Sequence, residues 1–139
     1  MKKTFSWDAG HATCTAFYKN RPFVGEAHCH PDDTDFESER VGLHIAEMRA
    51  DIIVLQYIRN VELKPSIETL SHIQDSFSRS SQYNAKSYEA KFIRRQLHRL
   101  QNELAAVNKE LASLKLELTV YIRQKEKFYQ SIRKARNKQ

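Results

Sequence analysis

Between residues 12 and 30, small apolar side chains alternate with polar ones with a period of two. Two runs, 13–18 and 23–29, are rich in Thr, aromatic and small apolar residues, and the segment 20–22 between them has the composition of a turn. We therefore expect a β-hairpin, in the register that pairs Cys14 with Cys29 and gathers the small apolar side chains on one face. Because an isolated hairpin is unstable in water, this face is expected to cover a helix.

A helical period replaces the alternation after position 33. Thr34 and Glu37 have the spacing of a capping box, which predicts that a helix begins there. Apolar residues then recur every three or four positions and cover more than one side, which is typical of a helix buried between two partners. The pair at 64–65, Lys-Pro, is expected to break this helix and to open a short amphipathic one. The serine-rich segment 78–81 is the predicted linker after it.

The most regular pattern lies in the last third of the chain. Apolar residues spaced 4-3-4-3 form a seam over more than five heptads, interrupted only by Lys125, and this is typical of a coiled coil. A helix from about 85 to 136 is too long for a small N-terminal unit to cover, so we predict a homodimer and leave the strand orientation open. Leu116, Val120 and Ile122 lie off the seam and predict contact with a third element, such as a folded-back N-terminal domain. The predicted dimerisation residues are Ile93, Leu97, Leu100, Leu104, Val107, Leu111, Leu114, Leu118, Tyr121, Phe128 and Ile132.

These patterns together predict an α+β, mainly α-helical protein. An N-terminal β-hairpin packed on a helix is followed by a short helix and a long C-terminal coiled-coil helix. The expected divisions are a hairpin-helix head at 1–63, a short helix and linker at 64–83, and a coiled-coil helix with a basic end at 84–139. All three glycines and all three prolines of the 139 residues lie within the first 65 positions. Their absence from the rest excludes a turn-rich all-β fold or a Gly-rich phosphate loop there.

The positive charge of the chain is concentrated at its C-terminal end. The net charge is +6, and residues 91–139 contain 13 Lys and Arg against 4 Asp and Glu. Such a segment is predicted to bind nucleic acid or an acidic protein, and a solvated helix end is the alternative. The candidate binding residues are Arg123, Lys125, Lys127, Arg133, Lys134, Arg136 and Lys138.

The expected location of the protein and the redox state of its cysteines are inferred from segments that the sequence lacks. No apolar run reaches the length that crosses a bilayer, and the lysines near the start precede no apolar stretch of a signal peptide. We therefore expect a cytoplasmic protein with no membrane partner. Its two cysteines, Cys14 and Cys29, are expected to be free thiols in a reducing compartment.

Three histidines are the candidate metal ligands. His28 and His30 share one face of the predicted hairpin, and His11 approaches them from the start of the other strand. Imidazole is a usual ligand of zinc, so a zinc site is one interpretation and a solvated polar face is the other. No other cofactor is expected. Since no Gly-rich oxyanion turn accompanies a nucleophile, we expect a protein that is not an enzyme.

Two segments carry a resemblance. The segment 25–33, GEAHCHPDD, and the segment 39–50, ERVGLHIAEMRA, resemble a pattern in small uncharacterised phage and prophage accessory proteins of Gram-positive bacteria. The likeness covers about residues 10–60. Gly42 and Ala46, four residues apart on one helix face, are expected to let the hairpin approach the helix closely.

The resemblance implies a phage accessory protein in the cytoplasm of an infected bacterial host. The expected function is to bind or inhibit a host or phage macromolecule, as in anti-defence or host takeover, through a dimeric coiled-coil protein. One alternative is a nucleic-acid-binding regulator that uses the basic helix end. Another is a small metal-binding protein or enzyme at His28 and His30.

Overall fold

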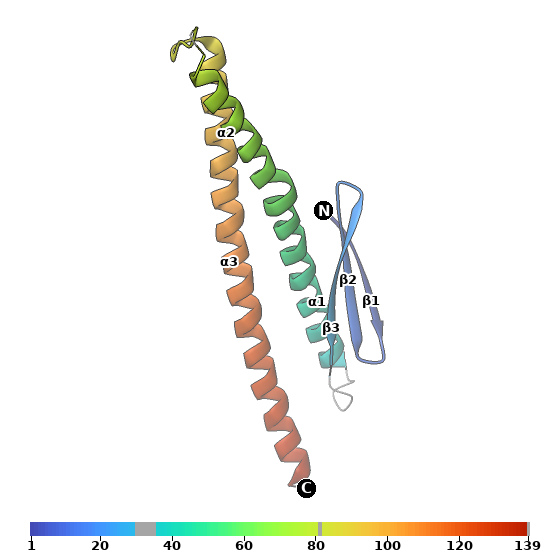
Figure 1. Cartoon of the computed structure of the whole chain (residues 1–139). Coiled ribbons are helices and arrows are strands. Elements are labelled where there is room, and N and C mark those ends of the chain that lie inside the picture. Colours follow the sequence, from blue (N-terminus) through green and yellow to red (C-terminus); the bar gives the residue numbers. More distant parts are fainter. Residues whose placement is uncertain (30–35, 81, 139) are drawn as a thin grey trace. The chain divides into compact units, whose positions relative to one another are not determined.

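The computed structural model describes residues 1–29, 36–80 and 82–138 and shows a mainly helical chain with a small N-terminal sheet (Figure 1). The strands are β1 (Lys2–Asp8), β2 (His11–Tyr18) and β3 (Arg21–His28), in the antiparallel order β1-β2-β3. This confirms the predicted fold class and adds a third strand. The sequence pattern missed β1 because the inward side of this strand begins with a charged residue, Lys3, instead of an apolar one.

The predicted hairpin is present, but its predicted register is wrong. Cys14 pairs with Gly25 and not with Cys29, because the strands are joined by a two-residue turn at Lys19 and Asn20, which have φ of 49° and 64°. Two consecutive positive φ angles are typical of the hairpin turn whose twist matches that of the strands. The correction shifts the pairing by four residues, an even number, so the predicted inward and outward faces are retained.

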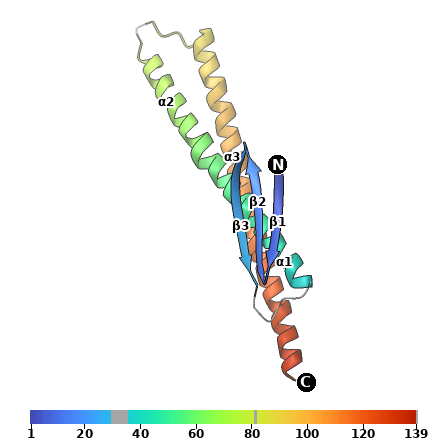
Figure 2. The same ribbon diagram turned by 90° about the vertical axis from the view of Figure 1, so that its right-hand side faces the viewer.

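Figures 1 and 2 show the sheet beside helix α1 (Phe36–Tyr57), and the inward face of the sheet packs closely on this helix. Gly25 lies so near α1 that a Cβ atom there would collide with the backbone of Ala46 and Ala50. At Gly42 of α1, a Cβ atom would lie 3.1 Å from the side chains of both Trp7 and Cys29. The small residues on both surfaces therefore allow the backbones of sheet and helix to approach, as expected for Gly42. The buried apolar side chains of the sheet are those of Ala12, Cys14, Ala16 and Ala27.

An ion-pair cluster joins the edge strand β1 to α1. The Lys3 ammonium lies 2.8 Å from a carboxylate oxygen of Glu47 and 2.9 Å from one of Asp51. Burial lowers the pKa of Lys3, but its hydrogen bonds to the two carboxylates outweigh that effect and hold the pKa above its ordinary value. The charge on the inward side of β1 therefore serves to attach the strand to the helix.

The predicted helix break at Lys64-Pro65 is not present. The chain passes from α1 through a π-helical segment, η1 (Ile58–Leu63), into α2 (Lys64–Ser78), and Lys64 has helical φ and ψ of −59° and −48°. Proline lacks an N–H and its ring clashes with the carbonyl of the preceding helical turn. The wider π turn relieves this conflict, and Pro65 lies in the first turn of α2, as predicted.

The last helix, α3 (Tyr88–Asn137), confirms the long C-terminal helix that the heptads predict. The hydroxyl of Ser87 accepts a hydrogen bond of 3.2 Å from the Ala90 N–H and so caps its first turn. The preceding connection includes an edge-to-face contact of Phe77 with Tyr83, whose ring centroids are 5.6 Å apart. The predicted linker begins where α2 ends, although Ser81 lies outside the described residues.

The chain forms two compact units. One combines Met1–Val54 with Leu111–Gln139, and the other is the continuous stretch Leu55–Glu110. The first therefore joins the sheet and most of α1 to the second half of α3, and the other contains η1, α2 and the first half of α3. The predicted boundaries at residues 64 and 84 divide the chain into consecutive segments. In the structure, one unit instead combines two segments that are distant in sequence.

Candidate functional site

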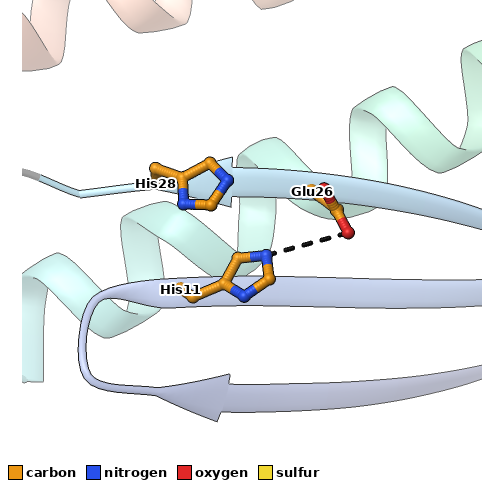
Figure 3. A group of neighbouring side chains, drawn as sticks. All are labelled: His11, Glu26 and His28. Carbon is orange, nitrogen blue, oxygen red and sulfur yellow. Dashed lines mark ion pairs between the residues drawn. The ribbon is translucent and has the colours of Figure 1, made fainter.

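Two histidines lie side by side on the outward face of the sheet. His11 of β2 pairs directly with His28 of β3, and their rings are stacked with centroids 4.4 Å apart and an interplanar angle of 4° (Figure 3). Directly paired residues of an antiparallel sheet point to the same side, which explains why the register brings the two imidazoles together. Asp8 of β1 pairs with His11 from the other side, so the three residues form one row across the sheet.

Glu26 completes this cluster. It precedes His28 by two residues on β3, so both side chains point outward, and its carboxylate lies 3.8 Å from Nε2 of His11. The Nε2 atom of His11 is shielded from solvent and has no hydrogen-bond partner among the described residues. One ligand atom from each of the three residues lies within 4.8 Å of the others. We call His11, Glu26 and His28 the His-Glu-His cluster.

The structure therefore brings together two of the three predicted metal ligands. His30 lies outside the described residues. The sequence reasoning missed Glu26, although its spacing of two from His28 on a strand was the signal that both share a face. The predicted approach of His11 to His28 is confirmed as a direct cross-strand pair.

The two cysteines are free thiols. Cys14 is buried against α1, and burial raises the pKa of its thiol. The thiol of Cys29 donates to the carbonyl oxygen of Ser38 across 3.6 Å. The predicted register placed Cys14 and Cys29 opposite each other across the hairpin. In the structure Cys14 pairs with Gly25 instead.

The predicted dimerisation seam is partly covered within one chain. Among its eleven residues, Leu97 and Leu111 are buried, Phe128 is 48% exposed and the others are half-buried. The Tyr121 ring packs edge-on against the imidazole of His44 in α1, with centroids 4.6 Å apart. Part of the seam thus packs against α1 of the same chain.

Two cavities lie between the second half of α3, α1 and β3. The larger, of about 490 Å³, includes Ile122 and Tyr129 in its lining, and the smaller, of about 370 Å³, includes Leu118 and Ile52. The off-seam residue Ile122 therefore faces the N-terminal part of the chain across the larger cavity, and a direct contact stays a prediction. In contrast, Leu116 is 66% exposed and Val120 is 42% exposed.

The predicted basic residues divide into two groups on α3. Lys125 and Arg133 are half-buried and line the larger cavity beside Glu126. The Lys125 ammonium also lies 5.6 Å from the centroid of the Tyr121 ring and 5.9 Å from that of Phe128. The exposed members of the predicted set are Arg123, Lys127, Lys134, Arg136 and Lys138.

The exposed apolar and basic residues of α3 fall into one line. Leu116, Val120, Arg123 and Lys127 are spaced 4-3-4 along the helix, which places them on a single face opposite the heptad seam. We call these four residues the outward stripe. It begins with two exposed apolar side chains and continues with two exposed cations.

No protein-family model, no curated protein and no solved structure matches this chain. The likeness to phage accessory proteins therefore stays a prediction. Among the described residues, none of the helices has both the length and the apolar character that a membrane-spanning segment requires.

Proposed function

We propose that this chain is a non-enzymatic interaction protein that binds an acidic protein partner on the outward stripe of α3. The observation that carries the proposal is the exposure of apolar Leu116 and Val120 in line with the cations Arg123 and Lys127. Exposed apolar side chains bordered by one sign of charge are typical of protein-binding surfaces. The complementary partner is a protein segment whose apolar residues are flanked by Asp or Glu.

The aromatic residues favour a protein partner over nucleic acid. Base stacking requires an aromatic face that is free, and the outward stripe contains none. Tyr121, which interrupts the basic segment, packs edge-on against His44 with centroids 4.6 Å apart. The basic residues could still attract phosphates, so nucleic acid is the alternative that the experiment must separate.

Pairing with a second copy is the other part of the proposal. The nine half-buried or exposed residues of the predicted seam leave apolar area that a second chain can cover. The seam and the outward stripe lie on opposite faces of α3, so a dimer would leave the stripe accessible. Sedimentation equilibrium over a hundredfold concentration range tests this part: we expect the dimer mass, and a monomer mass throughout would exclude pairing.

The resemblance supplies the biological setting of the proposal. If the chain is a phage accessory protein, the acidic partner is a host or phage protein in the bacterial cytoplasm, and binding inhibits or redirects it. This setting rests on the resemblance alone and is separate from the argument for the stripe.

Capture from a bacterial lysate with matched variants tests the stripe. The wild-type chain, Arg123→Glu/Lys127→Glu and Leu116→Glu/Val120→Glu are immobilised at equal density, together with the control Lys91→Glu/Arg95→Glu. The control makes the same charge change at exposed positions near the start of α3. We expect an acidic protein that is retained by the wild type and the control, lost with both stripe variants, and released by salt.

Two outcomes would overturn this assignment. Equal loss with the control variant would show a general charge effect instead of binding by the stripe. Retained material that is destroyed by nuclease, with affinity falling steeply as salt rises, would support the nucleic-acid-binding regulator.

A further inference from the structure

We propose that the His-Glu-His cluster on the outward face of the sheet binds one zinc ion. The ligands are an imidazole nitrogen of His11, one of His28 and a carboxylate oxygen of Glu26. Two imidazoles and a carboxylate form a donor set that zinc uses in proteins. The site lies on the sheet, so it is independent of the outward stripe and of the proposed partner.

The distances between the donor atoms suit a single ion. Zinc–ligand bonds of 2.0–2.2 Å in tetrahedral geometry separate neighbouring ligand atoms by about 3.3 Å. The three donor atoms lie within 4.8 Å of one another, and the Nε2 atom of His11 is 3.8 Å from the Glu26 carboxylate. Rotations about the side-chain bonds can close these gaps, because all three side chains extend from adjacent positions of one hairpin.

The Nε2 atom of His11 and the Glu26 carboxylate are 3.8 Å apart, which is an ion-pair distance but too long for a hydrogen bond. The Nε2 atom of His11 is shielded and makes no hydrogen bond to a described residue. A shielded nitrogen that makes no hydrogen bond is costly, and a zinc ion would use its lone pair. This is a second observation, independent of the residue types, that indicates a ligand at this point.

The charges around the cluster favour a cation. Asp8 stands opposite His11 on β1 and adds a second carboxylate to the same row. Arg49 approaches β3, but its guanidinium donates to the backbone carbonyl oxygen of Glu26, at 2.7 Å. That bond leaves the Glu26 carboxylate pointing toward His11 on the outward face.

Three protein ligands leave one position of a tetrahedral ion for water. His28 and Glu26 are exposed, so solvent reaches the open position. The expected site is thus a mononuclear zinc ion with three protein ligands and one water, bound without any change in the backbone of the hairpin.

Calorimetric titration of the metal-free, tag-free chain with zinc chloride tests the site. We expect one ion per chain, with a dissociation constant of about 1 μM or tighter. His11→Ala/His28→Ala should weaken binding more than about a hundredfold, and Glu26→Gln about tenfold, because each removes a direct ligand. The control His72→Ala/His98→Ala changes two exposed helix histidines and should bind zinc like the wild type.

Cobalt(II) substitution provides a second readout that reports geometry. Tetrahedral coordination gives intense visible absorption, expected for the wild type and for His72→Ala/His98→Ala but absent from His11→Ala/His28→Ala. Circular dichroism checks that the variants fold, and Glu26→Gln tests the site with an isosteric side chain. Absence of stoichiometric binding by the wild type, or full binding by either His11→Ala/His28→Ala or Glu26→Gln, would overturn the proposal.

Discussion

Gly25 is the position in the sheet where a side chain is least tolerated. Its backbone lies against the backbone of α1, where any side chain would meet Ala46 and Ala50. Neither neighbour can move away by changing a rotamer, because the contacts are to main-chain atoms. The separation of sheet and helix therefore depends on the absence of one Cβ atom.

Replacing Gly25 with Ala is expected to lower the free energy of unfolding by about 2–3 kcal/mol, since the sheet must move away from α1. Urea denaturation monitored by circular dichroism measures this change. Val24→Ala, at an exposed neighbouring position, is the matched control and should change the stability by less than about 0.5 kcal/mol. Equal effects of the two substitutions would contradict the close approach.

Stability is expected to fall at alkaline pH because of two residues. Folding raises the pKa of Lys3 above 10.5, so the stability from its ion pairs is fully present below that pH and is lost as pH rises through the folded pKa. Folding also raises the pKa of Cys14 above 9.0, so ionisation of the thiol favours the unfolded chain above pH 9.

Urea midpoints measured from pH 7 to 11 should therefore stay level to about pH 9 and then decline. In Cys14→Ala the decline should begin later, and in Lys3→Met the part above pH 10.5 should be smaller. An identical pH profile for both variants and the wild type would show that these groups do not cause the decline.

At the scale of elements, α3 depends on a defined start. The Ser87 hydroxyl caps the helix by accepting the Ala90 N–H, and Ala90 itself is buried. Ser87→Ala should lower the free energy of unfolding by about 1 kcal/mol, whereas Ser87→Asp keeps an acceptor and should change it little. Thermal denaturation compares the three proteins, and equal melting temperatures for wild type and Ser87→Ala would exclude the cap.

The sequence predicts elements better than it predicts their pairing. The heptads predicted α3 closely, since a period of 3.5 residues is a local property of the chain. The register of the hairpin depended on the backbone at Lys19 and Asn20, neither of which is a glycine that would mark positive φ. The helical backbone continues through Pro65 because of the π-helical segment η1, and no residue pattern predicts such a segment.

The candidate metal site shows the same division. The imidazoles were recognisable as residue types, and the parity of positions placed His11 and His28 on one face even in the wrong register. Their direct pairing, and with it the place of Glu26, required the correct register. The outward stripe was hidden because the sequence marks which residues are apolar or basic but not which α3 faces the chain itself covers.

At the scale of the molecule, one unit is closed by a contact between distant parts of the chain. Tyr121 of α3 packs on His44 of α1, 77 positions earlier, next to cavities lined by both helices. The predicted seam therefore has an intramolecular role in this unit, whichever oligomer forms.

Tyr121→Ala is expected to loosen the second half of α3 from this unit and to lower its stability by about 2 kcal/mol. Amide hydrogen exchange should become faster in both α1 and Leu111–Asn137, because the contact supports both helices. Tyr121→Phe keeps the ring and should retain most of the protection. Faster exchange confined to residues next to position 121 would show that the ring does not hold the two helices together.

The unit formed by Met1–Val54 and Leu111–Gln139 is discontinuous in sequence, and this affects how the protein folds during translation. The sheet and α1 emerge first, but their partner in α3 is translated only after the 56 residues of Leu55–Glu110. At ordinary rates of translation this interval lasts roughly 3–11 s. During it the apolar surface of α1 that later receives α3 is uncovered, a state in which nascent chains are vulnerable to aggregation or require a chaperone. The outward stripe follows Leu55–Glu110 in the sequence, so it can act only once that interval is over.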